Sequence, residues 1–325
     1  MQSLVAGMVL TWAGIAGALA AETSSIDALG WLKKIASASR QTSYAGTFVY
    51  HQGSQVGTLR ITHQVDAAGE HEKLETLDGP SREIVRDNDR VTCYLADSKT
   101  VLVEKRSAPR FPAALPLGPL SGITDNYNVR KGEHDRVAGM DCQVIVLEPK
   151  DNLRYGRRFC AEMATGLPLR ARTVNERNEV VELLAFTQIR IGDAAVKEEG
   201  LKSQFADKSH DWRVDRSGLI DDSAQPDSGW ELKGQIQGFR KLAEMRRSLP
   251  GGANQMSQIV YSDGLAAVSA FIEPLPKNPP ALGAANHGAV NIFVRPQADS
   301  MVTVIGEAPA RTVKQVAEML APKNK

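Results

Sequence analysis

Between residues 44 and 191 the chain is a series of short, strand-like segments separated by turn-forming residues. The segment 57–65, for example, alternates apolar and polar residues, which places Leu59 and Ile61 on one face of a strand. Asp-Gly-Pro, Asp-Asn-Asp and Asp-Ser sequences interrupt the series at short intervals. About ten strands joined by tight turns predict a mainly β fold, in which a large antiparallel sheet curls into a barrel or half-barrel.

A helix is expected before this series and a linker after it. Apolar residues repeat at helical spacing up to about residue 39, at Ile26, Leu29, Leu32 and Ile35. Residues 205–229 are polar, charged and turn-forming, which is typical of an interdomain linker. We therefore expect a first domain over residues 21–204.

Residues 230–325 form a second, smaller β-rich unit in this interpretation. Its strand-like segments are 238–247, 258–262, 267–273, 289–295 and 301–305. Residues 309–320 carry an apolar stripe at helical spacing, which predicts a closing helix and an α+β class. Residues 274–287 are rich in Pro, Gly and Ala, and we expect a mobile loop there.

The first residues are typical of an export signal. Residues 5–20 carry no charge and end in Ala18-Leu19-Ala20, a small-x-small cleavage site, so residues 1–20 are expected to be a secretory signal peptide. No Lys or Arg precedes the apolar run, and an uncleaved membrane anchor is the alternative. We expect the mature chain to be soluble and exported.

An exported chain meets an oxidising compartment, where cysteines form disulfides. The chain has three cysteines, Cys93, Cys142 and Cys160. A hairpin folded about residue 151 would set position 142 opposite position 160, close to disulfide reach. We therefore predict a Cys142–Cys160 disulfide and a buried thiol at Cys93. The chain has no Cys-x-x-Cys sequence, so neither a thioredoxin-type redox site nor a zinc ribbon is indicated.

Residues 107–123 interrupt the strand pattern. Four prolines exclude a central strand, yet the segment carries large apolar residues, Phe111, Leu115, Leu117 and Leu120. Long apolar loops in compact domains are often lids or binding loops. This loop either plugs the open end of the barrel or faces a ligand as a lid, and the two roles are compatible.

Sequence signatures of enzymes are absent. We find no Gly-x-Ser-x-Gly elbow, no dinucleotide or phosphate-binding glycine loop and no His-Glu-x-x-His. We therefore expect no catalytic residues, no metal site and no cofactor. One basic cluster is notable, made of Arg154, Arg157, Arg158, Arg170 and Arg172. It could bind phosphate or carboxylate head groups, but we favour ion pairs with Glu176, Glu179 and Glu182.

The charge balance excludes a strongly basic nucleic-acid-binding protein, because 39 Lys and Arg face 38 Asp and Glu. From Trp230 to the end, however, 11 basic residues face 7 acidic ones, a surplus of +4. The remainder has 28 basic and 31 acidic residues. The surplus suits an acidic partner, or it is ordinary solvated surface.

Several phrases resemble one protein family in the same order along the chain. They are Tyr44-Ala-Gly-Thr-Phe-Val-Tyr-His-Gln-Gly53, Leu77-Asp-Gly-Pro-Ser-Arg-Glu-Ile-Val-Arg86, Arg154-Tyr-Gly-Arg-Arg158, Thr165-Gly-Leu-Pro-Leu169, Val260-Tyr-Ser-Asp-Gly-Leu-Ala-Ala-Val-Ser269 and Val302-Thr-Val-Ile-Gly-Glu-Ala-Pro309. Together they resemble the RseB/MucB family of periplasmic regulators of the sigma-E (AlgU) envelope-stress response. The resemblance covers nearly the whole mature chain.

This resemblance implies a fold and a function. The large domain would be similar to the lipoprotein carriers LolA and LolB, an unclosed β-barrel around an apolar cavity. The chain would bind the periplasmic region of a membrane anti-sigma factor, RseA or MucA, and shield it from the site-1 protease DegS (AlgW). Mislocalised lipopolysaccharide or lipoprotein would occupy the cavity and release the partner. The alternative is a periplasmic lipid or lipoprotein carrier of LolA type, and a homo-oligomer is left open.

Two sets of residues follow as candidates. We expect acyl chains to contact Phe48, Leu59, Ile61, Phe111, Leu115, Leu117 and Leu120. We expect the partner to contact Arg240, Lys241, Arg246 and Arg247. In a regular strand Arg240 and Arg246 share one face and Lys241 and Arg247 the other, so at least one basic pair should be exposed. The alternative is a solvated basic edge that deters strand pairing.

Overall fold

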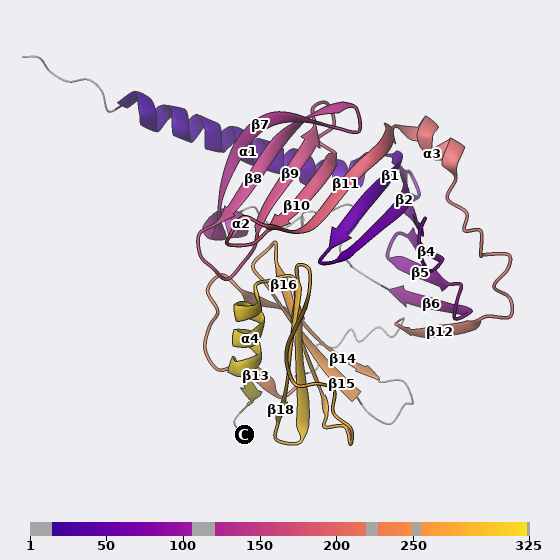
Figure 1. Cartoon of the computed structure of the whole chain (residues 1–325), viewed down its shortest axis with the longest axis vertical. Helices are drawn as coiled ribbons and strands as arrows, with labels where there is room; N and C mark the ends of the chain where they lie inside the picture. The colour runs from indigo at the N-terminus through magenta and orange to yellow at the C-terminus, as the bar shows by residue number, and fades with distance from the viewer. Residues whose placement is uncertain (1–14, 106–120, 219–226, 249–254, 324–325) are drawn as a thin grey trace, which may run out of the picture.

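The computed structural model describes residues 15–105, 121–218, 227–248 and 255–323. Two β-rich domains lie one beside the other, and the first is built around the larger sheet (Figure 1). This confirms the expected class: a large unclosed sheet followed by a smaller β domain with a C-terminal helix.

The large sheet has twelve strands, and its edge strands β12 and β7 do not pair with each other. In chain order the strands are β1 (Tyr44–Gln52), β2 (Gln55–Asp66), β3 (Gly69–Thr76), β4 (Arg82–Asp87), β5 (Arg90–Leu95), β6 (Thr100–Lys105), β7 (Tyr127–Val137), β8 (Met140–Pro149), β9 (Gly156–Glu162), β10 (Pro168–Val174), β11 (Val180–Ile191) and β12 (Arg213–Gly218). All neighbours from β1 to β11 pair antiparallel, as the tight turns between them predict.

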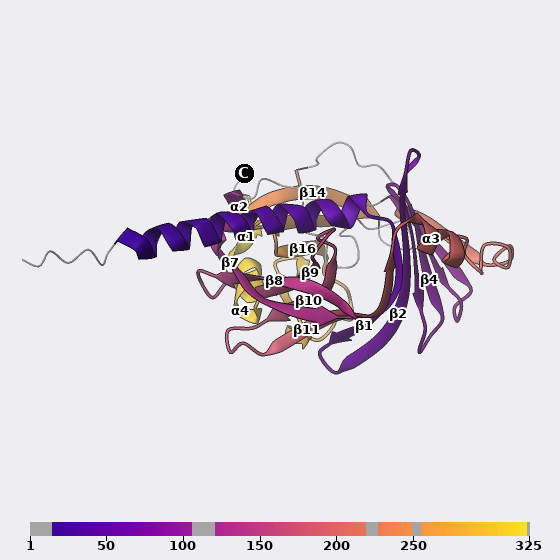
Figure 2. The same cartoon turned by 90° about the horizontal axis from the view of Figure 1, so that it is seen from above.

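The large sheet bends, and helix α1 (Ile15–Gln41) lies along the inner side of the bend (Figure 2). Leu32 and Ile35 of α1 are fully buried and pack with Ile145 and Leu147 of β8. The apolar stripe seen in the sequence therefore covers the inner face of the sheet. No helix within the described ranges is long and apolar enough to cross a membrane.

The segment expected to be a linker contributes to the large sheet. β12 pairs with β6 in parallel, so this edge departs from the antiparallel pattern. Phe205 and Trp212 pack against each other with their rings tilted by 40° and their centroids 5.5 Å apart, and both lie near Tyr94 of β5. These aromatic contacts hold the returning chain against the outer face of the sheet.

The predicted disulfide is confirmed, but the predicted register is wrong. Cys142 and Cys160 are bonded with their Cα atoms 5.3 Å apart, although Cys142 lies opposite Glu162 and Val144 lies opposite Cys160. The hairpin is centred one residue later than expected, and within its turn Asp151 Oδ1 accepts a hydrogen bond from the Leu153 amide. The bond therefore joins diagonal neighbours. Cys93 keeps its thiol and is partly exposed rather than buried.

The second domain is a six-stranded sheet covered by one helix. Its strands are β14 (Arg240–Ser248), β15 (Gln255–Ser262), β16 (Ala267–Pro274), β17 (Gly283–His287), β18 (Val290–Gln297) and β19 (Ser300–Gly306), and β13 (Trp230–Leu232) pairs with β20 (Leu320–Pro322) in a separate two-stranded sheet. Helix α4 (Ala310–Met319) buries Val313 and Val316 against the core of the larger of these two sheets. The segment 274–287 was expected to be a loop, but its last five residues form edge strand β17.

Two short helices complete the fold. Helix α2 (Ser121–Asn126) precedes β7, and helix α3 (Asp193–Glu199) follows β11. The Asn126 amide reaches the Asp263 carbonyl of the second domain at 3.5 Å, so α2 lies at the domain junction.

Candidate partner and ligand surfaces

A buried ion pair joins the two domains. Arg154, in the turn between β8 and β9, donates to Asp263 of the second domain at 2.6 Å, and both side chains are 0% exposed. Arg154 also contacts Asp151 at 2.8 Å and donates to the Gln237 carbonyl at 2.7 Å. Burial alone would lower the pKa of Arg154, but hydrogen bonds and charges from Asp151 and Asp263 raise it overall. The guanidinium is therefore a charged and fully engaged link between the domains.

Tyr127 extends this link. Its hydroxyl donates to the Asp263 carboxylate at 3.2 Å, and the Arg154 guanidinium lies over its ring at 5.8 Å. Burial and then the charge of Asp263 raise the pKa of Tyr127 well above its usual value. Tyr127 stays a neutral donor at all physiological pH values.

A second polar link crosses the junction at β9. Arg157 contacts Glu182 of β11 at 3.4 Å and Glu307 of the second domain at 3.0 Å. Burial would lower the pKa of Arg157, but the two glutamates raise it overall. Tyr50 donates to Glu182 at 2.7 Å, which ties β1 into the same network.

The tips of two hairpins touch at the junction. Gly53 lies in the turn between β1 and β2 in the first domain, and Gly288 lies in the turn between β17 and β18 in the second. A Cβ atom on Gly288 would lie 2.4 Å from Cγ of Gln52 and 2.6 Å from the Gly53 nitrogen. Gly288 also has a φ of 59°. Only glycine fits this contact without strain.

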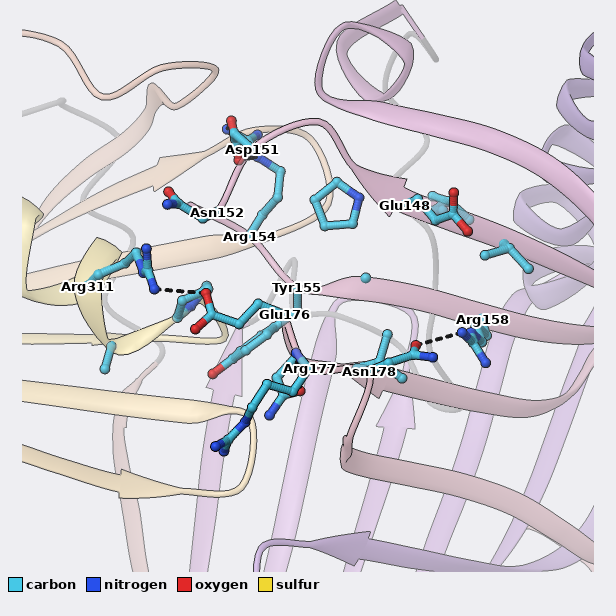
Figure 3. Close-up of a pocket in the computed structure, with 18 of the residues that line it drawn as sticks. Glu148, Asp151, Asn152, Arg154, Tyr155, Arg158, Glu176, Arg177, Asn178 and Arg311 are labelled. Carbon is cyan, nitrogen blue, oxygen red and sulfur yellow. Dashed lines mark hydrogen bonds and ion pairs between the residues drawn. The ribbon is translucent and has the colours of Figure 1, made fainter.

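A cavity of about 850 Å³ opens at the junction (Figure 3). Its walls come from the outer face of β7–β9, the turn after β10 and the start of α4. Most of its charges are paired: Arg311 contacts Glu176 at 2.8 Å, Arg130 contacts Glu148 at 2.7 Å, and Arg177 contacts Glu179. Arg158 instead donates to the neutral Asn178 amide oxygen at 2.6 Å.

The predicted pairing of the arginine cluster is only partly right. Arg157 pairs with Glu182 as expected, but Arg154 pairs with aspartates and Arg170 pairs with Asp135. The other two predicted partners, Glu176 and Glu179, pair with Arg311 and Arg177. The prediction used sequence neighbours, whereas the sheet brings in partners from β7 and from the second domain.

The predicted acyl-chain residues lie on the inner face of the large sheet where the structure describes them. Phe48 and Leu59 are cross-strand partners, and Phe48 and Ile61 are fully buried in a cluster with Phe186. These residues line neither the junction cavity nor a smaller cavity of about 110 Å³ at β7–β10. Phe111, Leu115, Leu117 and Leu120 lie outside the described residues. The lipid site stays a prediction.

The predicted partner residues lie on β14, an edge strand of the second domain. Arg240, Lys241 and Arg246 are exposed, while the side chain of Arg247 lies outside the described part of the chain. The expected division of faces is wrong, because a bulge at Leu242 shifts the register between Lys241 and Ala243. Lys241 therefore shares a face with Arg246.

No local sequence pattern predicts that Asp263, Glu307 and Gly288 lie at the domain junction, although the first two stand within the phrases that resemble the family. Asp263-Gly264 marks a turn, but nothing in a single chain says which domain a turn will touch. Among the described residues, no cluster of His, Cys, Asp and Glu side chains has the makeup of a metal site.

The chain is similar to known regulators over nearly its whole length. Residues 27–205 match the MucB/RseB N-terminal domain, and residues 224–321 match the MucB/RseB C-terminal domain. The sigma factor AlgU regulatory protein MucB of Pseudomonas aeruginosa is 30% identical over 320 residues, covering 93% of each chain. The sigma-E factor regulatory protein RseB of Escherichia coli is 24% identical over 318 residues, covering 97% of this chain and 95% of that one.

Solved structures of MucB are also similar to this chain over both domains. The crystal structure of MucB in complex with MucA(peri) matches with a TM-score of 0.70 and 29% identity, covering 92% of this chain and 100% of that one. The crystal structure of MucB on its own matches with a TM-score of 0.66 and 28% identity, covering 92% of this chain and 99% of that one. Matches to both domain models in the expected order establish the assignment: the chain belongs to the MucB/RseB family.

Proposed function

We propose that this chain binds the periplasmic region of a membrane anti-sigma factor of the RseA/MucA type and so restrains sigma-E-type stress signalling. The observation that carries the proposal is the match to MucB solved together with MucA(peri), which spans both domains of this chain. The relatives of known function are regulatory proteins of sigma factors.

We propose that β14 carries part of the partner contact. It is an edge strand, and no strand within the described residues pairs with its outer side, so its outer backbone groups suit pairing with another chain. Its basic side chains at Arg240, Lys241 and Arg246 are exposed, and Leu242 beside them is 69% exposed. An apolar side chain among exposed cations suits an acidic peptide with apolar anchors. The alternative remains a solvated edge that repels strands.

We further propose that the bound partner is shielded from site-1 proteolysis and that lipid reverses this shielding. The lipid would be lipopolysaccharide or a lipoprotein acyl chain on the inner face of the large sheet, where Phe48, Leu59 and Ile61 lie. A lipid can release the partner only if it binds the partner-free conformation more tightly. Each buried CH₂ group would add about 0.8 kcal/mol, so affinity should rise with acyl-chain length.

We place the mature chain in the periplasm, with residues 1–20 removed. The Cys142–Cys160 disulfide supports this compartment, because disulfides persist in the oxidising periplasm and are rare in the cytosol.

The partner surface is tested by charge reversal. The mature chain is immobilised and the periplasmic segment of the cognate anti-sigma factor is passed over it at low and high salt. Arg246→Glu with Arg247→Glu should slow association and weaken its salt dependence, since exposed charges mainly set the association rate. The matched control is Lys277→Glu with Lys314→Glu, which makes the same charge change in the same domain but away from β14. Unchanged kinetics in the β14 variant at low salt would leave only the solvated-edge interpretation.

The lipid site is tested by placing charge on the proposed lid. Leu115→Asp with Leu117→Asp should abolish lipopolysaccharide binding and leave the fold intact, because buried charge is incompatible with an acyl-chain site. Val56→Asp is the control, since Val56 is already 68% exposed on the β1–β2 hairpin. Unchanged lipopolysaccharide affinity in the lid variant would refute the lid.

A further inference from the structure

Three arginines gather on the outer face of the large sheet. Arg158 of β9 and Arg172 of β10 are direct cross-strand partners, and Arg170 lies two residues away on the same face. They line a cavity of about 110 Å³ together with Asp135 of β7. The residues that pack against α1, such as Phe159 and Ala171, alternate with them along these strands and point to the inner side. The cluster is therefore separate from the inner face where the lipid site was placed.

The charge of this cluster is not balanced by the described residues. Asp135 pairs with Arg170, and it is the only carboxylate among the residues that line the cavity. Arg158 has only the neutral Asn178 as a side-chain partner, and its Nε atom is buried without a hydrogen bond within the described residues. Arg172 makes no ion pair with any residue that the structure describes. Three guanidiniums and one carboxylate leave a formal charge of +2.

This imbalance sets the cluster apart from its surroundings. In the adjoining junction cavity Arg130, Arg177 and Arg311 each face a glutamate. Like charges directly opposite each other in a sheet are destabilising. Burial and then the Arg170 charge lower the pKa of Arg172, and the Arg158 charge acts in the same direction. The free protein thus holds an arrangement that an anion would stabilise.

We propose that Arg158 and Arg172, with Arg170, form a binding site for a phosphate group carried as a monoester or as free phosphate. A phosphate monoester carries nearly two negative charges at neutral pH, which matches the formal +2, whereas a single carboxylate would neutralise half of it. Guanidinium groups bind phosphate oxygens in a bidentate manner. The cavity has room for one tetrahedral anion. This site goes beyond the proposed function and does not depend on partner binding.

The test uses the mature full-length chain and two probes. Inorganic phosphate is titrated by calorimetry at constant ionic strength set with chloride. Phosphatidylcholine vesicles containing phosphatidic acid, a lipid phosphomonoester, are compared with pure phosphatidylcholine vesicles by co-sedimentation. Arg158→Gln and Arg172→Gln each remove one guanidinium, and Arg177→Gln is the control because Arg177 is exposed and paired with Glu179.

We expect Arg158→Gln and Arg172→Gln to weaken binding of the active probe by about tenfold or more, and Arg177→Gln to leave it unchanged. Phosphate should also raise the melting temperature of the wild type and not that of the two variants, which keeps the test valid if calorimetric heats are small. Binding of inorganic phosphate alone identifies the free anion, and binding of phosphatidic acid vesicles alone identifies a lipid head group. Binding of neither probe, or equal binding by wild type, Arg158→Gln and Arg172→Gln, would overturn the proposal.

Discussion

Replacing Asp263 with alanine tests the physical basis of the domain junction. The Asp263 carboxylate accepts four hydrogen bonds: from Arg154 at 2.6 Å, from the Tyr127 hydroxyl at 3.2 Å, and from the amides of Leu265 and Ala266 at 2.8 and 2.7 Å. Alanine would leave the buried Arg154 with its other partners only, and the buried Tyr127 hydroxyl without its acceptor.

The size of the effect follows from burial. Breaking a buried ion pair by removing one partner destabilises a protein by about 3–5 kcal/mol. Asp151 still pairs with Arg154 in the variant, so we expect the lower end of that range, about 3 kcal/mol. The control is Asp227→Ala: Asp227 pairs with Lys323 at 2.6 Å, but the two side chains are 65% and 36% exposed. An exposed pair contributes about 0–1 kcal/mol.

The assay is urea denaturation of wild type, Asp263→Ala, Arg154→Met and the double variant. The double variant should be more stable than the sum of the single effects predicts, by about 0.5–3 kcal/mol, because each single variant already loses the shared contact. Calorimetry should also resolve separate melting of the two domains in Asp263→Ala. A loss below about 1 kcal/mol, or effects that add to within about 0.5 kcal/mol, would refute the claim that this pair couples the domains.

Three further predictions concern stability. Removing the disulfide with Cys142→Ala and Cys160→Ala, which frees a loop of 18 residues, should lower the free energy of unfolding by about 3 kcal/mol, and a loss under about 1 kcal/mol would contradict this. Gly288→Ala should destabilise the hairpin contact by about 1–3 kcal/mol, because a Cβ would meet Gln52 at 2.4 Å; Gly79→Ala, which also has a positive φ but open space around it, separates strain from the clash. Burial raises the pKa of Tyr261 to about 12, and burial together with the charge of Asp263 raises the pKa of Tyr127. The contribution of these two neutral tyrosines to the free energy of unfolding is therefore fully present below about pH 10, the pKa of an unfolded tyrosine. It is lost as the pH rises through their pKa values in the folded protein. Tyrosinate absorbance that appears near pH 10 in the folded protein, without loss of stability, would contradict this prediction for the two tyrosines.

Local signals predicted most of the strands. Alternating apolar residues and Asp- or Gly-containing turns are local properties. They predicted about ten strands between residues 44 and 191, where β1 to β11 lie, and a closing helix over 309–320, where α4 lies. Strand β17 was missed because proline dominates the segment before it, at Pro274, Pro276, Pro279 and Pro280, and a run of turn formers hides a short edge strand. β12 was missed because its residues, Arg-Val-Asp-Arg-Ser-Gly, are nearly all polar and lack the apolar alternation of a strand.

The sequence pattern did not predict strand register or the side-chain pairs between residues far apart in the chain. One extra residue in the bulge at Leu242 reverses which basic side chains share a face of β14, and alternation alone does not mark such an insertion. The disulfide was predicted correctly although the hairpin is shifted, since diagonal neighbours also come within bonding distance. Arg154 and Asp263 lie 109 residues apart, and only the packing of one domain on the other brings them together.

The most direct measurement of the central claim is the rate of site-1 cleavage of the anti-sigma factor's periplasmic segment. That segment is incubated with its site-1 protease alone, with the mature wild-type chain, and with the Arg246→Glu and Arg247→Glu variant. We predict that the wild-type chain slows cleavage in a saturable manner, that the variant does so only at higher concentration, and that lipopolysaccharide restores the rate. Cleavage at the same rate with and without a saturating amount of the wild-type chain would contradict the account.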